Sequence, residues 1–123
     1  MAEHPNAALT RDLLEAMGRG DMERVDALMA DDIVWHEIGR AEPRRGKQEL
    51  RESSGSADYE IAVETHDVLA NDEHTIALVN ATATRAGRTF KYRTAEICHV
   101  RDGKVVERWA FSDDTAAINE FFA

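Results

Sequence analysis

The first third of the chain shows helical spacing of its apolar positions, followed by one strand-like segment. Between residues 6 and 17, apolar side chains recur three and four positions apart and two glycines follow, so the pattern predicts a helix with Asn6 as its N-cap. A second, short helix is expected over residues 22–29, capped by Asp21. Residues 33–38 are rich in β-branched and aromatic side chains and predict a strand.

From residue 59 onward the pattern changes to that of consecutive strands. Four strands are expected, over residues 59–69, 74–85, 89–101 and 104–112. The breaks between them are Asn71-Asp72, Ala86-Gly87 and Asp102-Gly103, which are residue pairs that suit tight hairpin turns. Three hairpins in succession predict an antiparallel meander, so the fold class expected for a single domain of residues 1–123 is α+β.

The segment between the first strand and the meander is expected to be largely irregular. Two glycines, a proline and three arginines mark residues 39–46 as a loop. Residues 47–52 are expected to form one or two helical turns. The run from Ser53 to Ser56 is expected to be a turn or linker.

Side chains alternate across the expected strands, and neither face of the sheet is strongly polar. In the strand over residues 89–101, one face is apolar except for Glu96. A sheet that is apolar on both faces must be covered on both, commonly by helices on one side and by another subunit on the other. The sequence therefore predicts a homodimer that forms through the open face of the sheet.

Composition and charge narrow the function classes. The chain has 123 residues, of which 43% are hydrophobic, and this is enough for one core. An excess of acidic over basic residues, 24 against 15, gives a formal net charge of −9, which opposes binding to nucleic acid. No apolar run is long enough to span a membrane, and the first residues lack the features of a secretory signal, so a cytoplasmic location is expected.

Cysteine and histidine spacing argues against a metal centre. Cys98 is the only cysteine, which excludes an intrachain disulfide and a cysteine-rich zinc site. The five histidines are scattered, with no pair on one element at a spacing typical of metal ligands. We therefore expect neither a metal nor a cofactor.

Four local strings carry a family resemblance. They are Gly20-Asp21, Ala30 to His36, Arg101 to Val106 and Trp109 to Asp114. In this order they resemble the nuclear transport factor 2-like superfamily, particularly its SnoaL-like polyketide cyclase and ketosteroid isomerase branches. The resemblance implies a cone-shaped, curved, antiparallel or mixed sheet wrapped around N-terminal helices, the cystatin-like roll, with a conical pocket for a small hydrophobic ligand.

The resemblance points to His36 and Glu96 as catalytic residues. His36 stands where the isomerases carry their general base, and a neutral imidazole can accept a proton near neutral pH. The alternative is a histidine that is hydrogen-bonded within a core. Glu96 stands near the place of a protonated acid that stabilises an oxyanion, unless it turns to solvent or pairs with Arg93 or Arg108.

Asp113 is the third catalytic candidate, because cyclase-like members carry an acid/base aspartate near the end of the last strand. Asp113 and Asp114 both occupy such positions. Either one equally suits the N-cap of a helix expected over residues 115–122. The sequence alone leaves both roles open.

Seven further residues are expected to line the ligand pocket. They are Leu13, Trp35, Tyr59, Asn80, Tyr92, Trp109 and Phe111. The steroid isomerases use a tyrosine of the first helix as a hydrogen-bond donor, and its counterpart here is Leu13, which cannot donate. The resemblance therefore disfavours steroid isomerase activity itself.

Two functions from different classes remain. The first is a cofactor-independent enzyme of the isomerase, cyclase or dehydratase type, which acts on a carbonyl or polyketide-like compound by proton abstraction and return. The second is a non-catalytic dimeric module that binds a hydrophobic ligand or a partner protein. A shared fold does not choose between them.

Overall fold

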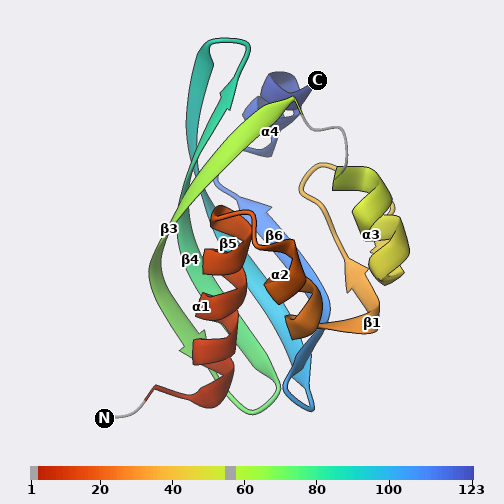
Figure 1. Ribbon diagram of the computed structural model, residues 1–123. Coiled ribbons are helices and arrows are strands. Elements are labelled where there is room, and N and C mark those ends of the chain that lie inside the picture. Colours follow the sequence, from red (N-terminus) through yellow and green to blue (C-terminus); the bar gives the residue numbers. More distant parts are fainter. Residues whose placement is uncertain (1–2, 55–57) are drawn as a thin grey trace.

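The computed structural model describes residues 3–54 and 58–123, and helices precede the sheet as expected (Figure 1). The elements are α1 (Pro5–Gly18), α2 (Met22–Leu28), β1 (Met29–Trp35), β2 (Arg44–Arg45), α3 (Gly46–Ser54), β3 (Tyr59–Ala70), β4 (His74–Arg85), β5 (Arg88–Arg101), β6 (Lys104–Ser112) and α4 (Thr115–Phe122). Ser53 and Ser54 end α3, and the rest of the turn expected there lies outside the described residues.

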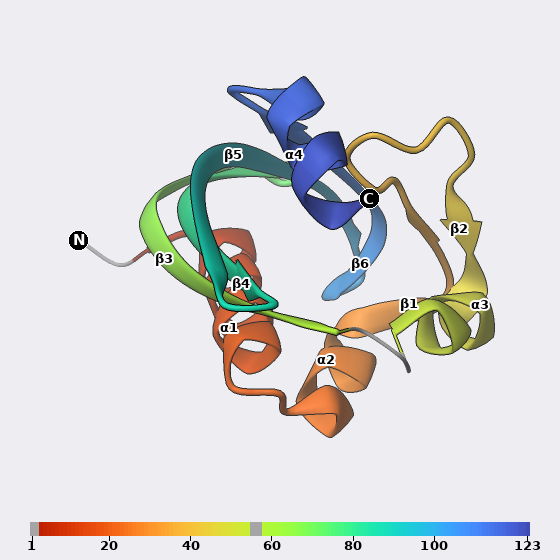
Figure 2. The ribbon, with the colours of Figure 1, turned by 90° about the horizontal axis from the view of Figure 1, so that it is seen from above.

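The described strands form one sheet in the order β2-β1-β6-β5-β4-β3. Strands β3 to β6 pair antiparallel with their neighbours in sequence, as the meander predicts, whereas β1 pairs parallel to β6. The sheet is strongly curved, and β3, β4 and β5 form an arc around α1 (Figure 2). The α+β fold class and the curved mixed sheet around an N-terminal helix are therefore confirmed.

The hairpin turns lie where the turn residues predict them. Ala86 and Gly87 have φ of 51° and 77°, and Asp102 and Gly103 have φ of 53° and 74°. Two consecutive residues with positive φ give a type I′ turn, whose twist matches that of the paired strands. Asn71 closes the remaining turn, because its side-chain oxygen accepts hydrogen bonds from two backbone amides that follow it.

The first helix begins two residues earlier than expected, with His4 instead of Asn6 as its N-cap. Pro5 occupies its first position, where the missing N–H needs no partner, and the ring of His4 accepts a hydrogen bond from the backbone N–H of Asn6. Asn6 is therefore not the cap. Its side chain donates instead to two carbonyl groups of the β3–β4 turn and ties the start of α1 to the sheet. Asp21 caps α2 as expected.

Strand β1 lies earlier in the sequence than predicted. It spans Met29–Trp35 instead of residues 33–38, and Asp31 and Asp32 lie inside it with exposed side chains. The parallel pairing with β6 starts at Met29, so tertiary pairing overrides the local preference of two aspartates. Because the strand ends at Trp35, the following residues belong to a loop.

The hydrophobic core lies between α1, α2 and the inner face of the sheet. Leu13, Ile33 and Val105 are fully buried at its centre. Burial of a side chain of this size stabilises a fold by about 1.5–3 kcal/mol relative to leaving it exposed. Beyond this core, the C-terminal end of α1 and residues of α4 line a cavity.

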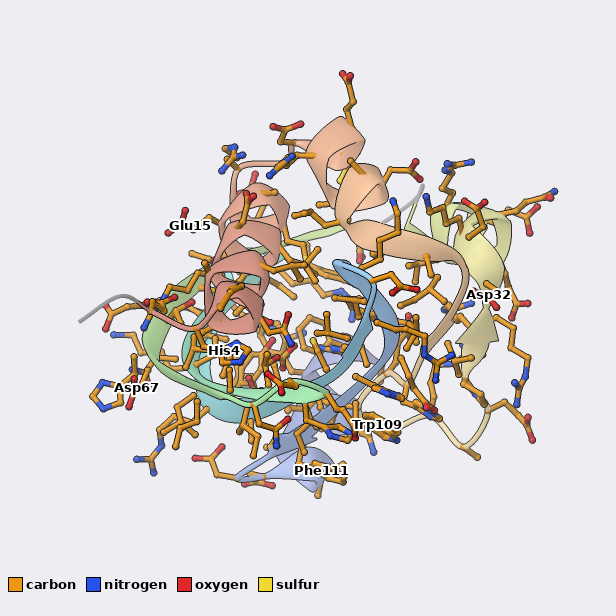
Figure 3. The ribbon with its side chains drawn as sticks, turned by 90° about the horizontal axis from the view of Figure 1, so that it is seen from below. His4, Glu15, Asp32, Asp67, Trp109 and Phe111 are labelled. Atoms are coloured by element: carbon orange, nitrogen blue, oxygen red, sulfur yellow. The ribbon has the colours of Figure 1, made fainter. Side chains whose placement is uncertain are left out.

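Part of the outer face of the sheet is apolar and exposed. Leu69, Ile76, Leu78 and Phe111 are between 39% and 61% exposed on this part of the molecule. Figure 3 shows Phe111, together with Trp109, on the side of the sheet that faces away from α1. None of the described helices has the length and apolar character that a membrane crossing requires.

Candidate functional site

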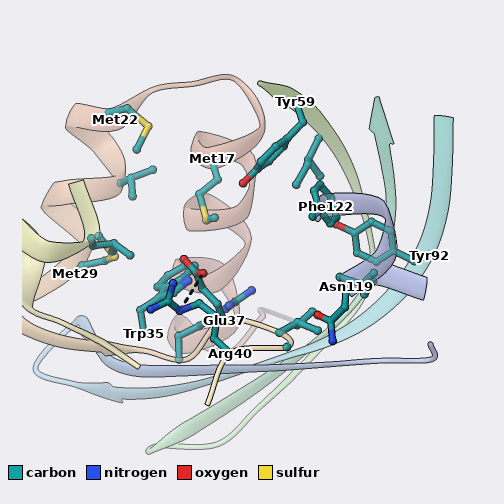
Figure 4. A pocket seen from close by; sticks show the side chains of 17 residues that line it. Met17, Met22, Met29, Trp35, Glu37, Arg40, Tyr59, Tyr92, Asn119 and Phe122 are labelled. Atoms are coloured by element: carbon teal, nitrogen blue, oxygen red, sulfur yellow. Dashed lines mark ion pairs between the residues drawn. The ribbon is translucent and has the colours of Figure 1, made fainter. Parts of the chain in front are cut away.

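A cavity of about 530 Å³ opens at the C-terminal end of α1. Its wall is mostly apolar and is built from elements that are far apart in the sequence. Methionines of the helices, among them Met17 and Met22, lie on one side, and Tyr59, Tyr92 and Phe122 lie on the other (Figure 4). The cavity is therefore suited to a small molecule with a large apolar surface.

A smaller chamber of about 170 Å³ continues the cavity toward the sheet. The two spaces share five lining residues, among them Met17, Tyr92 and Arg108, and are therefore adjacent. Apolar side chains of α1, β3 and β4 surround this inner chamber. Its polar residues are contributed by β5 and β6, where Thr94, Glu96 and Arg108 meet.

Glu96 and Arg108 form a buried ion pair in the inner chamber. They are only 7% and 9% exposed. Nε of Arg108 donates to Oε1 of Glu96 at 3.1 Å, and Nη2 donates to the same oxygen. Glu96 thus lies on the inner, apolar face of β5 as the strand alternation predicts, and its alternative partner Arg108 is the one found. No hydrogen bond between described residues ends on Oε2.

Strand β1 and the residue that follows it hold Arg108 in position. Nη1 of Arg108 donates to the backbone oxygen of His36 at 2.9 Å. The guanidinium carbon lies 4.3 Å from the centre of the Trp35 ring, and such a cation–π contact strengthens when water is excluded. The planar guanidinium donates hydrogen bonds to a carboxylate and to a carbonyl group at the same time. A lysine ammonium cannot do this in the same geometry.

Two hydroxyl groups lie close to this ion pair. Thr94 precedes Glu96 by two positions on β5, so both side chains face the cavity. Oγ1 of Thr94 is buried and has no hydrogen-bond partner among the described residues, a situation that costs about 1–3 kcal/mol. Burial, with a smaller contribution from the charge of Glu96, raises the pKa of Tyr92, so its phenol keeps its proton at neutral pH.

Charged residues and a close backbone contact define the mouth of the cavity. Glu37 lines it and forms ion pairs with Arg44 at 2.8 Å and Arg40 at 3.8 Å. Gly39 has φ of 83°, and a Cβ atom there would lie 1.9 Å from Oδ1 of Asn119 on α4. Only glycine combines this conformation with so close an approach. The contact closes one side of the mouth.

The expected position of His36 in the cavity is wrong. Trp35 lines the cavity, and because successive side chains of an extended segment point to opposite faces, the next residue faces outward. The His36 ring stacks on Trp109 with 5.5 Å between ring centres, and its Nε2 lies 2.8 Å from Oε2 of Glu107. The side chain thus belongs to the outer face, and only its backbone oxygen contacts the inner ion pair.

The two aspartates after β6 lie outside the cavity as well. Asp113 accepts hydrogen bonds from the backbone N–H and from Nε of Arg93, and these contacts lower its pKa. Asp114 accepts from the backbone N–H of Ala117 at 3.0 Å and is the N-cap of α4. The capping role is thus confirmed for Asp114, and the expected position of Asp113 in the pocket is wrong because its partner Arg93 points to the outer face.

Three of the seven expected pocket residues line the cavity, namely Trp35, Tyr59 and Tyr92. The four that do not are Leu13, which is in the core, and Asn80, Trp109 and Phe111, which lie on the outer face. For α1 the error has a simple cause. Each helical residue is turned by 100° from the one before it, and the cavity contacts Leu14 and Met17 instead of Leu13.

Two polar residues of the site, Thr94 and Arg108, and the cavity wall formed by α4 are absent from the site predicted by the sequence. The alternation of β5 already predicts that Thr94 faces the cavity, whereas the sequence indicates Arg108 only as one of two possible partners for Glu96. Helix α4 contributes Ile118 and Phe122, whose spacing of four predicts one helical face. No local pattern shows where that face docks, so its place in the cavity wall was not predictable.

Two further observations concern the acidic, histidine and cysteine side chains of residues 3–54 and 58–123. No three His, Cys, Asp or Glu side chains in these ranges converge in a way that holds a metal ion. Cys98 is 2% exposed within the core, and burial raises the pKa of its thiol to about 11.

Comparison with known proteins places this fold in a family. The model of the SnoaL-like domain matches residues 10–108. A search of curated protein sequences gave no match.

Among solved structures, Bal32a from a soil-derived mobile gene cassette is 22% identical, with a TM-score of 0.81 and 97% of each chain covered. An NTF2-like protein from Burkholderia xenovorans LB400 is 28% identical, with a TM-score of 0.80, and the match covers 100% of this chain and 99% of that one.

An LEH-like epoxide hydrolase from M. tuberculosis is 19% identical, with a TM-score of 0.76, and the match covers 89% of this chain and 83% of the other. Identities at this level show a shared fold and no more. The family model, in contrast, spans well over half of the sequence and includes β1, the cavity-facing parts of α1 and β5, and Arg108. The chain therefore belongs to the SnoaL-like domain family, within the NTF2-like fold.

Proposed function

We propose that this chain binds a small, largely apolar molecule in its cavity and transfers a proton between that molecule and Glu96. One observation carries the proposal, the buried ion pair of Glu96 and Arg108 at the inner end of a mainly apolar cavity. Membership of the SnoaL-like family and the likeness to an epoxide hydrolase favour a catalytic role for such a pocket.

The cost of burying charge is the reason to assign the pair a function. Removing an ion from water costs several kcal/mol even after relaxation, and replacing a buried pair with apolar side chains is often neutral or stabilising. A core has no need of Glu96 and Arg108. Their position against a cavity therefore favours a role in which the charges act on a ligand.

Oε2 of Glu96 is the atom that we assign to proton transfer. Both hydrogen bonds from Arg108 go to Oε1, and they fix the orientation of the carboxylate. A carboxylate in this position accepts a proton from carbon or oxygen next to a ligand carbonyl and returns it. Tyr92 and Thr94 supply hydroxyl donors for the ligand oxygen on which negative charge develops.

Hydrogen exchange next to a ketone tests the proposal without knowledge of the natural substrate. In deuterium oxide, β-tetralone exchanges the hydrogens next to its carbonyl group, and NMR follows the loss of their signal. We expect the wild-type protein to accelerate this exchange in proportion to its concentration. Glu96→Gln keeps the shape of the side chain but cannot accept a proton, so we expect it to lower the protein-dependent rate by about 100-fold or more.

Glu64→Gln is the matched control, because Glu64 is exposed and pairs across strands with the outward-facing Asn80. Its exchange rate should equal that of the wild type. If folded Glu96→Gln, verified by circular dichroism, catalysed exchange at the wild-type rate, Glu96 would not be the base. If the wild type gave no acceleration at all, catalysis of this kind would be refuted.

A second function, that of a dimeric binding module, is favoured by the outer face of the sheet. Cross-strand pairing places Leu78 beside Ala95 and Ala95 beside Phe111, so apolar side chains form a continuous row over three strands. Exposed apolar patches of this kind are typical of interfaces. We propose that two copies of the chain pair through this face. Such pairing is compatible with a catalytic cavity on the inner face of the sheet.

The cytoplasmic location stays a prediction.

A further inference from the structure

We propose that the ligand presents a neutral hydroxyl group on a six-membered ring, a phenol or an enol, to Thr94 and Glu96 in the inner chamber. This inference rests on the proposed function and names the class of molecule that its site accepts. The volume of the inner chamber, its unmatched hydrogen-bonding atoms and the balance of its buried charge carry the inference.

The volume of the inner chamber suits one ring. It measures about 170 Å³ and is bounded by apolar side chains, among them Leu14, Val79 and Ala81. An apolar cavity of about 150 Å³ in another protein binds benzene. A single six-membered ring therefore fills the chamber, and a second ring would extend into the larger outer cavity.

The hydrogen-bonding atoms select the group on that ring. A carboxylate has no proton to give, so Oε2 of Glu96 requires a donor. The hydroxyl of Thr94 both donates and accepts, and it lacks a partner among the described residues. One ligand hydroxyl satisfies both, since it donates to Glu96 and accepts from Thr94. An ether oxygen in the same place would leave the carboxylate unmatched.

The buried charges exclude ionic groups on the ring. Thr94, Glu96 and Arg108 are each more than nine-tenths buried, so charges near them are poorly screened. An anionic substituent would face the carboxylate of Glu96, and a cationic one would face the guanidinium of Arg108. The charges of Glu96 and Arg108 cancel each other. A neutral hydrogen-bond donor on the ligand therefore adds no uncompensated charge to the chamber.

Two aromatic compounds that differ by one methyl group test the proposal. 2-Naphthol places a hydroxyl on the first ring, and 2-methoxynaphthalene replaces its proton with a methyl group. Fluorescence titration measures both affinities for the wild-type protein. We expect 2-naphthol to bind at least about 10-fold more tightly, because the ether leaves the buried carboxylate without a donor.

Variants of the two contacts complete the test. Thr94→Val keeps the shape of the side chain and removes its hydroxyl, and we expect it to weaken 2-naphthol binding by about 5-fold. Glu96→Gln should reduce the preference for 2-naphthol over the ether. Thr82→Val is the matched control, because Thr82 lines a groove on the outer face, and its affinities should equal those of the wild type.

Equal affinity of the wild type for both compounds would overturn the inference, and so would unchanged 2-naphthol binding by folded Thr94→Val. The β-tetralone exchange on the same preparations separates this inference from the proposed function. Hydroxyl recognition without exchange would refute proton transfer and retain the ligand class. Exchange without hydroxyl recognition would refute the ligand class and retain proton transfer.

Discussion

At the scale of single residues, Glu96 and Arg108 depend on each other. The carboxylate receives two hydrogen bonds from one guanidinium, which in turn contacts the backbone of His36 and the ring of Trp35. Because both side chains are buried, removal of one leaves the other as an uncompensated charge. The pair therefore links the stability of the fold to the proposed chemistry of the cavity.

Arg108→Met tests this dependence. We expect it to lower the free energy of unfolding by about 3–5 kcal/mol, as breaking a buried pair does. Arg93→Met is the matched control, because the Arg93 side chain is 75% exposed in its ion pair with Asp113 and such pairs contribute about 1 kcal/mol or less. Urea unfolding measures both. Equal losses for the two variants would contradict the assignment of a buried charge pair.

Cys98 gives the stability a pH dependence in the alkaline range. Burial raises the pKa of its thiol from 9.0 to about 11, so the native state holds this proton more tightly than the unfolded chain does. The resulting stabilisation is complete below pH 9 and is lost as the pH rises to about 11, and it amounts to about 3 kcal/mol. Urea unfolding at several pH values should show this loss in the wild type and a smaller one in Cys98→Ala. Parallel curves for the two proteins would refute it.

At the scale of elements, α4 is a wall of the cavity that is held at both ends. Asp114 caps its first turn. At its other end, Nη1 of Arg85 donates to the backbone oxygens of Phe121 and Ala123. Loss of either contact should loosen the helix and open the cavity beside Phe122.

Asp114→Ala should weaken α4 by about 1 kcal/mol, the usual effect of removing an N-cap. Amide hydrogen exchange measures the result, and we expect faster exchange over residues 117–122. Asp113→Ala is the matched neighbour, because its contacts are with Arg93 on β5, so it should leave exchange in α4 unchanged. The assignment of the cap would be wrong if the two variants accelerated exchange in α4 equally.

At the scale of the whole molecule, the sheet separates a cavity on its inner face from an apolar surface on its outer face. Leu78 and Phe111 are 39% and 61% exposed on that surface. The double substitution Leu78→Lys and Phe111→Lys places two charges there without touching the cavity.

We expect light scattering to give the mass of a dimer for the wild type and of a monomer for this double variant, because buried lysines without partners oppose association. Thr84→Lys, at an exposed position of β4, should remain dimeric. A monomeric wild type, or a dimeric double variant, would contradict the proposed interface.

The fold was more predictable than the site, because the fold depends largely on contacts between residues close in sequence and the site on contacts between residues far apart in sequence. Turn pairs such as Asp102-Gly103 and strand alternation are local, so the meander and the inward direction of Glu96 follow from the sequence. The direction of His36 depends on where β1 ends, which is set by pairing with β6. The cavity wall depends on the docking of α4 and on the rotation of α1, which decides between Leu13 and Leu14.

The parallel pairing of β1 with β6 also has a consequence for folding. His36 and Glu107, which contact each other at this junction, are 71 residues apart in the sequence. The hairpins of β3 to β6 close short loops, whereas this contact must close a long one at a greater entropic cost. We therefore expect β1 to dock late, and with it the backbone oxygen of His36 that accepts from Arg108. We expect a chain that has formed only its hairpins not to bind the proposed ligand, so ligand present during refolding should stabilise the final state without accelerating the steps that precede it.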